Sequence, residues 1–214
     1  MSKTNYSYIG ISFIILIFGI WAVPKIVAHF QKADLEVIGK APSFEFIDQD
    51  GKTISNKDYE GKVYVVEFFF TTCPSICPIM NRRMVDVQNE FYGNPNFGIA
   101  SFTINPEVDT PKVLKEYAKT YGANHVNWHF MTGDKDKILK LSNEGFNLYA
   151  ESVMDDNGDF SHSGLFALID KEGNIRSRKD KFGNPYIYYQ SLDEENAPNQ
   201  IQELKEDIKK LLNE

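Results

Sequence analysis

The chain has 214 residues, with 23 Lys or Arg against 30 Asp or Glu, which gives a formal net charge of -7. This length suits one domain with an appendage, and a hydrophobic fraction of 42% supplies a packed core, which excludes disorder for most of the chain. The acidic balance argues against a nucleic-acid surface, and two cysteines are too few for a disulfide scaffold or a four-thiolate metal site, so they are either incidental or central.

The N-terminal segment is expected to be a membrane anchor. Residues 8–23 are apolar and carry no charge, and such a run approaches the ~17 residues that can span a bilayer. Because no small-residue cleavage pattern follows, we favour an uncleaved signal anchor at residues 1–24 over a cleaved signal peptide. The lysines around this run would place the following domain in the cytoplasm, but long domains cross membranes largely regardless of such charges. A polar tether at 25–40 and a domain at 41–214 complete the expected organisation.

Strand and helix patterns alternate along the rest of the chain, which predicts an α/β fold with a central sheet flanked by helices. The apolar run at 62–70 is typical of a strand buried on both faces, and the helix after it has apolar side chains on one side. A hairpin is expected at the start of the domain, because Asp50-Gly51 is a turn signal. The expected strands are 62–70, 97–104, 128–131, 164–170 and 174–177, and the expected helices are 78–91, 111–121, one opening at 133–134, and one from about 198.

The two cysteines fall between the strand at 62–70 and the helix at 78–91. We expect Cys73 and Cys77 in a tight turn just before the helix, with Pro78 in its first turn. The partial positive charge of a helix N-terminus favours the thiolate, so the pKa of these thiols is predicted to be lowered. The three residues between them allow a disulfide, and they also allow both sulfur atoms to bind one soft metal ion such as Cu(I) or zinc.

A metal held by two thiols needs a third ligand, and the four histidines are the candidates. His29 lies in the tether and is set aside. His125 and His129 border a short strand and are expected to be structural or solvent-exposed. His162 lies directly before the strand at 164–170, and in a thioredoxin-like fold the loop before that strand faces the cysteine turn. A lone histidine is more often a hydrogen-bonded polar residue than a ligand, but this placement makes His162 the leading candidate.

Several motifs together give the chain a resemblance to a known family. The chain resembles the Sco/SenC family, thioredoxin-fold copper proteins of cytochrome c oxidase assembly, over about Gly39 to Leu212. The motifs are Gly39-Lys40-Ala41-Pro42-x-Phe44, Asp58-Tyr59-x-Gly61-Lys62, Cys73-Pro74-x-x-Cys77-Pro78, Asn105-Pro106-Glu107-x-Asp109-Thr110-Pro111, Thr132-Gly133, and His162 before the strand at 164–170. The sequence departs from the family pattern at Asn105, which is usually Asp, and at Ser161, which is often acidic, although Asp159 offers a nearby carboxylate.

The resemblance implies a function and a location. It implies that Cys73, Cys77 and His162 bind one copper ion per chain, as Cu(I) or Cu(II). It implies a single-pass protein of the bacterial inner membrane, with its domain on the outer, periplasmic side. The partner implied is the copper-binding subunit of cytochrome c oxidase, whose copper A centre would be supplied, with other copper chaperones or thiol reductants as further partners.

Other functions use the same two sulfur atoms. A thiol–disulfide reductase would keep the recipient's copper-binding cysteines reduced, with Cys73 and Cys77 as its redox pair. A peroxidase would form a sulfenate at Cys73. The remaining alternative is that both cysteines are buried and inert and serve only to fill the core. Against it, the motif lies at a strand–helix junction and not on a periodic apolar face. The segment from Ala150 to Ser161, directly before His162, is polar and is expected to be a mobile loop.

Overall fold

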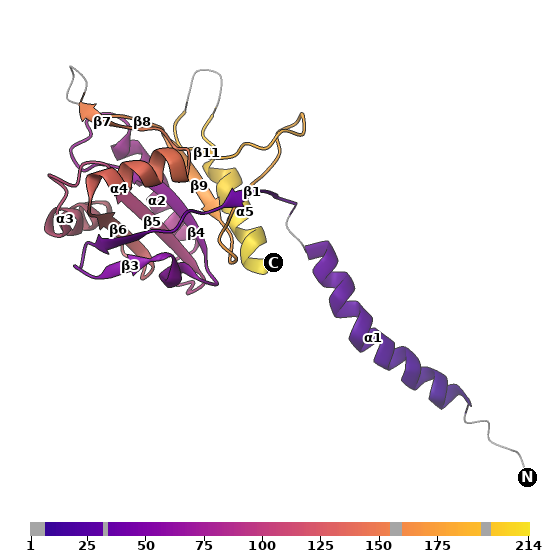
Figure 1. Cartoon of the computed structure of the whole chain (residues 1–214). Helices are drawn as coiled ribbons and strands as arrows, with labels where there is room; N and C mark the ends of the chain where they lie inside the picture. Colours follow the sequence, from indigo (N-terminus) through magenta and orange to yellow (C-terminus); the bar gives the residue numbers. More distant parts are fainter. Residues whose placement is uncertain (1–6, 32–33, 155–159, 194–197) are drawn as a thin grey trace, which may run out of the picture.

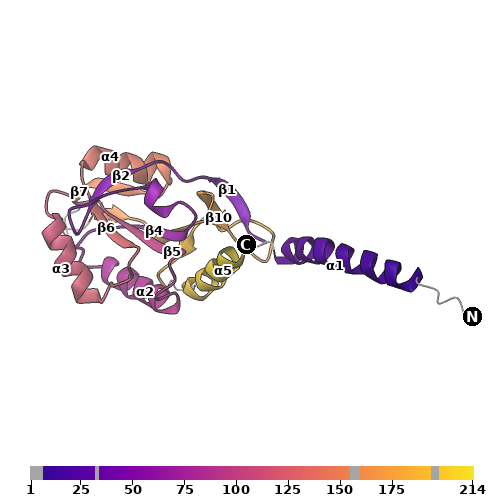
Figure 2. The same cartoon turned by 90° about the horizontal axis from the view of Figure 1, so that it is seen from below.

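The computed structural model describes residues 7–31, 34–154, 160–193 and 198–214, without the side chains of 7–9, 24–31, 151–154 and 160–162. Its centre is a mixed nine-stranded sheet in the order β1-β10-β9-β4-β5-β6-β2-β3, with β11 paired to β9. Figure 1 shows helices packed around this sheet, and Figure 2 shows α2, α3 and α5 on one side of it and α4 on the other. The predicted α/β fold with a sheet between helices is therefore confirmed.

The middle of the sheet consists of parallel strands, which are the most deeply buried. In β4 (Val63–Phe69) and β5 (Phe97–Thr103) every residue is buried, as expected for strands that are covered on both faces. β6 (Trp128–Thr132) continues the parallel set beyond β5. On the other side of β4, β9 (Leu165–Ile169) runs antiparallel to it. The carboxyl ends of β4 and β5 and the start of β9 therefore meet at one edge of the sheet.

The outer strands are short, and two of them, β1 and β11, were not expected. The N-terminal hairpin is confirmed as β2 (Glu45–Asp48) and β3 (Thr53–Ser55). The hairpin expected after residue 164 is also confirmed, and its second strand is β10 (Asn174–Ser177), which pairs with β9. The structure differs from the expected tether, because β1 (Glu36–Lys40) pairs with β10 and belongs to the sheet. Its alternation of apolar and polar side chains is too weak to be read as a strand. A short β11 (Tyr189–Gln190) completes the sheet.

The helices follow the predicted capping signals. α2 (Cys77–Glu90) begins one residue before the expected start. α3 (Pro111–Tyr121) begins after Thr110, whose side chain accepts from the Val113 N–H, and ends at Gly122 with a φ of 72°. The remaining helices are α4 (Lys135–Lys140), which continues as the π-helical turn η2 (Leu141–Gly145), the closing α5 (Ile201–Asn213), and the short 3₁₀ helix η1 (Asn56–Tyr59). α2 and α5 contact each other, and α5 also contacts β4.

Two segments lie outside the nine-stranded sheet. The N-terminal helix α1 spans Ser7–Gln31. Within the described residues, no helix is both long and apolar enough to cross a membrane. The segment expected as a polar loop from Ala150 to Ser161 instead contributes two strands, β7 (Ala150–Met154) and β8 (Phe160–His162), which pair antiparallel; residues 155–159 lie outside the described residues, as does the candidate carboxylate of Asp159.

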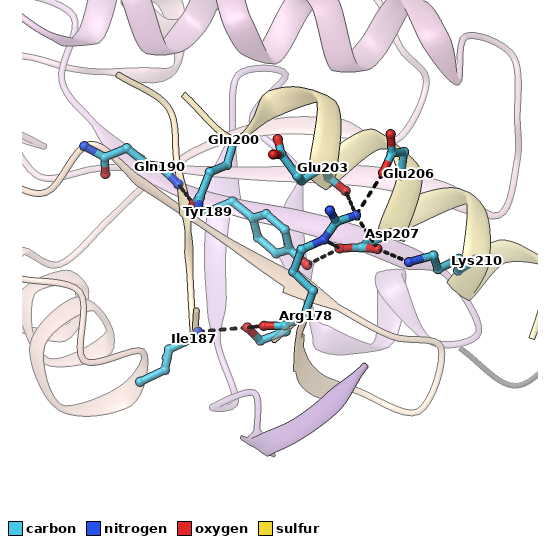
Figure 3. Close-up of polar contacts among 10 residues, drawn as sticks. Arg178, Ile187, Tyr189, Gln190, Gln200, Glu203, Glu206, Asp207 and Lys210 are labelled. Carbon is cyan, nitrogen blue, oxygen red and sulfur yellow. Dashed lines mark hydrogen bonds and ion pairs between the residues drawn. The ribbon is translucent and has the colours of Figure 1, made fainter. Parts of the chain in front are cut away.

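An ion network holds α5 to the strands beside it (Figure 3). The guanidinium of Arg178 donates to both carboxylate oxygens of Asp207, with N···O distances of 2.6 and 2.9 Å. The Tyr189 hydroxyl and the Lys210 ammonium also donate to Asp207, at 2.9 and 2.8 Å. The same segment holds Ile187 at a positive φ of 68°, which is costly for a β-branched residue, and its N–H donates to the Ser177 hydroxyl at 2.8 Å. The ion network thus joins α5 to β11 and to the residue that follows β10, close in sequence to this turn.

Candidate dithiol site

The two cysteines lie where β4 passes into α2, at the carboxyl edge of the central strands. The chain leaves β4 at Phe69, turns, and reaches Cys73, whose N–H donates to the Phe70 carbonyl at 3.4 Å. Cys77 is the first residue of α2, so it does not precede the helix as expected, and Pro78 lies in the first helical turn as predicted. Proline is tolerated there because the first N–H groups of a helix have no intrahelical acceptor.

Cys73 and Cys77 are buried and lie next to each other, and no disulfide joins them. Cys73 is 6% exposed and Cys77 is fully buried. The backbone N–H of Cys77 donates to the Sγ of Cys73, with an N···S distance of 3.3 Å. The Ser75 hydroxyl lies 3.6 Å from the same sulfur. The chain between the cysteines therefore folds back on itself, so that a helix N-terminal N–H points at the first thiol.

The protonation of Cys77 contradicts the expectation from the helix N-terminus. Burial, followed by the hydrogen bond and charge of the neighbouring Cys73, raises the pKa of Cys77 well above its ordinary value. The loss of hydration outweighs the partial positive charge of the helix, because a thiolate inside the core gives up its contacts with water. Cys77 is thus a protonated thiol at neutral pH, and it needs a partner such as a metal ion or a second sulfur to lose its proton.

His125 and His129 lie away from the dithiol and make local contacts. His129 is on β6, opposite Ala100 of β5, and its Nδ1 lies 3.1 Å from a carboxylate oxygen of the buried Asp48. His125 precedes β6 and packs its ring against Phe97; burial lowers its pKa, so that it is neutral at pH 7. Both have the structural surroundings that were expected of them.

The backbone position of His162 is described, but its side chain lies outside the described residues. His162 ends β8, opposite Ala150, three positions before β9 begins at Leu165. Because β9 runs antiparallel to β4, with Val66 opposite Ala167, the start of β9 lies at the edge where β4 ends and leads to the cysteines. Among the side chains that are described, no group of three or more His, Cys, Asp or Glu is arranged to hold a metal ion.

A polar cluster beneath Cys77 was missed by the sequence reasoning. The Asn81 amide donates to the Cys77 carbonyl at 3.0 Å and to the Tyr117 hydroxyl at 3.1 Å. Glu67 of β4 is fully buried and accepts a hydrogen bond from the Ser101 hydroxyl at 2.6 Å. Its negative charge would raise the pKa of Cys77 further. The available signal was Glu67 itself, the one acidic residue in the expected strand at 62–70, which carries no other charge after Lys62.

The buried carboxyl of Glu67 predicts a specific pH dependence of stability. Burial raises its pKa from 4.5 to about 7 in the fold. Between these values the folded state binds a proton that the unfolded state has lost, so stability is highest below pH 4.5 and falls as the pH rises to about 7, by roughly 3 kcal/mol. Glu67→Gln keeps the shape without the ionisable proton. In urea unfolding, the variant should gain roughly 3 kcal/mol relative to the wild type between pH 4.5 and pH 8.

Ser101→Ala is the control for this measurement, because it removes the hydrogen bond to Glu67 and leaves the carboxyl in place. It should lower stability and extend the loss of stability to higher pH, because the Ser101 hydrogen bond lowers the pKa of Glu67. A difference between wild type and Glu67→Gln that stays constant from pH 4.5 to pH 8 would show that Glu67 is ionised in the fold.

The chain is similar to known proteins both in sequence and in fold. A family model described as SCO1/SenC matches residues 33–195. The SCO1 protein homolog of Bacillus subtilis is 33% identical over 134 residues, which make up 62% of this chain and 69% of that protein. The structure of BsSco, described as having a disulfide switch and as a member of the Sco family of cytochrome c oxidase assembly proteins, is 29% identical with a TM-score of 0.64, over 81% of this chain and 94% of that one. Copper-bound ScoI of Bradyrhizobium japonicum shares the fold at 23% identity and a TM-score of 0.61, over 80% of this chain and 99% of that one.

Proposed function

Because the chain belongs to the SCO1/SenC family, we propose that it binds one copper ion through Cys73 and Cys77 and delivers or prepares it for the copper A centre of cytochrome c oxidase. The observation that carries this proposal is a pair of adjacent thiols at a helix start, which form no disulfide and are placed so that the Cys77 nitrogen lies 3.3 Å from the Cys73 sulfur. The partner would be the copper-binding subunit of the oxidase, and further copper chaperones or thiol reductants would load or reduce the protein.

The residues present fit a soft cation. Two adjacent thiols offer the ligand type that selects Cu(I) over hard cations such as magnesium or calcium. Both cysteines are more than 90% shielded from solvent, so a bound ion would be protected from water. Cys73 lies nearer the surface than Cys77, which would let an incoming thiol reach Cys73 first and displace it. Transfer would then proceed by exchange of one sulfur at a time.

Proton release accompanies binding in this scheme. Cys77 keeps its proton at neutral pH because burial raises its pKa, and it loses that proton when its sulfur binds the metal. Copper binding would therefore strengthen as the pH rises. Oxidation of the two thiols to a disulfide would remove both ligands, so the redox state of the pair would decide whether the protein carries copper.

His162 is proposed as the third ligand. Its backbone ends β8 and leads into β9, whose start lies at the edge of the sheet from which β4 leads to Cys73. An imidazole nitrogen suits Cu(II) as well as Cu(I), whereas thiolates alone favour Cu(I). His162 would then matter most for the oxidised metal.

Anaerobic titration of the reduced protein with copper tests the proposal. In competition with a Cu(I) chelator, the wild type should take up one Cu(I) per chain. His162→Ala should retain most Cu(I) affinity and weaken Cu(II) binding by at least about a hundredfold, equivalent to roughly 3 kcal/mol. His129→Ala is the matched control, since His129 pairs with Asp48 and should affect neither ion. Failure of the wild type to compete with the chelator at any protein concentration would refute copper binding.

A thiol–disulfide reductase is the second candidate, favoured by the same pair of adjacent thiols, which form no disulfide. This protein would reduce a disulfide in the recipient and become a Cys73–Cys77 disulfide itself. The two functions separate at His162. Reductase activity predicts that His162→Ala leaves the rate of disulfide exchange nearly unchanged, whereas the copper function predicts the loss of Cu(II) binding described above.

We also propose that residues 1–24 anchor the chain in the bacterial inner membrane, with the domain on the periplasmic side. The support is the composition of α1, whose side chains Phe13, Ile14 and Phe18 are each more than 60% exposed and would be shielded by lipid. Fractionation of cells expressing the full chain should place it in membranes, with the domain open to protease in spheroplasts. Recovery in the soluble cytoplasmic fraction would refute the anchor.

A further inference from the structure

The loop that carries Cys73 is tied to a distant part of the chain by one buried carboxylate. Asp109 lies between β5 and α3 and is fully buried. Its Oδ2 accepts from the backbone N–H of Thr71 at 3.0 Å, and its Oδ1 accepts from the hydroxyl of the same residue. The hydroxyl of Thr103 also donates to Oδ2. Both carboxylate oxygens therefore hold Thr71, two residues before the first cysteine.

Asp109 is itself held in place by hydrogen bonds with its neighbours. Thr103 is the last residue of β5, and its hydroxyl accepts from the Asn105 N–H at 3.0 Å while it donates to Asp109. The Asp109 N–H donates to the Asn105 carbonyl at 3.0 Å, and the following residue caps α3. The Ile104 N–H donates to the Phe69 carbonyl at 2.8 Å, which joins the ends of β4 and β5. Asp109 is thus fixed at the carboxyl edge of the sheet before it binds the loop.

The hydrogen bonds between Asp109 and Thr71 restrict the position of Cys73. From Thr71 the chain has only one intervening residue before Cys73, whose N–H donates to the Phe70 carbonyl. With Thr71 held through both its backbone and its side chain, the Cys73 sulfur stays where the Cys77 N–H can donate to it. A carboxylate accepts all three of these hydrogen bonds, whereas an asparagine has a single acceptor oxygen, and its amide would have to donate to the Thr71 hydroxyl in place of accepting from it.

We propose that Asp109 is a positioning residue for the dithiol, which holds the Cys73 loop in the arrangement of the reduced, copper-competent state. This inference rests on the proposed function, although it concerns the thiol pair whether or not copper is bound. Asp109 acts through Thr71 and does not contact the sulfur atoms. If the loop is released, the reduced arrangement of Cys73 and Cys77 is less stabilised relative to the disulfide. Oxidation to the disulfide then becomes easier.

The test is the equilibrium of the thiol pair with glutathione, measured on the full chain without copper. In this reaction the two thiols form one disulfide, and their two electrons and two protons convert one glutathione disulfide to two glutathione thiols. For Asp109→Asn the equilibrium constant for disulfide formation should rise at least fivefold over the wild type. Asp134→Asn is the matched control: it too removes a carboxylate at a helix start, one that accepts from the Lys137 N–H at 2.9 Å far from the dithiol, and its constant should match the wild type.

A second pair of variants keeps the test decisive if Asp109→Asn fails to fold. Thr71→Val removes the hydroxyl that donates to Asp109, whereas Thr71→Ser retains it. The valine variant should shift the equilibrium towards the disulfide by at least threefold, and the serine variant should behave as the wild type. Smaller shifts in Asp109→Asn and Thr71→Val, or shifts towards the dithiol, would overturn the inference. That result would leave the proposed function standing, because wild-type copper binding is measured separately.

Discussion

Replacing Cys77 by serine is expected to weaken Cu(I) binding by the reduced protein at least about a thousandfold, which corresponds to roughly 4 kcal/mol. Cys77 is fully buried and supplies one of two adjacent sulfur atoms, and a hydroxyl oxygen is a poor ligand for a soft ion. Serine would also leave a buried hydroxyl in place of the thiol. The measurement is competition with a Cu(I) chelator under anaerobic conditions.

Cys73→Ser should have an effect of similar size, because the site needs both sulfur atoms. Ser75→Ala is the control, since its hydroxyl lies 3.6 Å from the Cys73 sulfur and its loss leaves both thiols intact. That variant should bind Cu(I) within about tenfold of the wild type. If either cysteine variant also binds Cu(I) within tenfold of the wild type, the two-sulfur site is wrong.

The largest effect on stability is expected from Asp207→Ala, at about 3–5 kcal/mol. Asp207 is fully buried and accepts hydrogen bonds from Arg178, Tyr189 and Lys210 (Figure 3). Its removal leaves the guanidinium of Arg178, which is 20% exposed, without its main buried counter-ion. Urea unfolding of the wild type and the variant at neutral pH measures the difference.

Glu206→Ala is the matched control, because Glu206 binds the same guanidinium from the same helix but is 51% exposed. Exposed ion pairs contribute little, so this change should cost less than about 1 kcal/mol. Burial alone would raise the pKa of Asp207, but the hydrogen bonds from Arg178, Lys210 and Tyr189 outweigh it and lower the pKa. The stability contributed by the Arg178–Asp207 pair should therefore be present at neutral pH and be lost in acid, when Asp207 is protonated. Equal effects of the two substitutions would contradict the assignment of the network to Asp207.

The sequence predicted the parts of the fold in which one physical signal dominates. The run at Val63–Phe69 is apolar on both faces, and Thr110 and Gly122 mark the ends of α3, so each was predicted close to its observed position. β1 and the β7–β8 pair were missed because they are short and their apolar and polar side chains do not alternate clearly. The partner of β1 is also distant in the chain, because β1 pairs with β10. Such strands are set by tertiary contacts that local patterns do not contain.

The site was predictable in its residue types and less so in its energetics. The spacing of Cys73 and Cys77 between a strand and a helix correctly placed both thiols together. The expected lowering of the Cys77 pKa was wrong, because a sequence shows the helix start but not how completely the sulfur is buried. The carboxylates of Glu67 and Asp109 likewise become visible as parts of the site only once β4, β5 and α3 are assembled around it.

X-ray absorption spectroscopy of the reduced, copper-loaded protein tests the central claim most directly, because it counts the sulfur atoms bound to the metal. If Cys73 and Cys77 both bind the metal, one Cu(I) per chain should have two sulfur ligands, and the number of sulfur ligands should fall to one in either Cys73→Ser or Cys77→Ser. A copper ion bound only through nitrogen or oxygen, or a sulfur count unchanged by both substitutions, would contradict it.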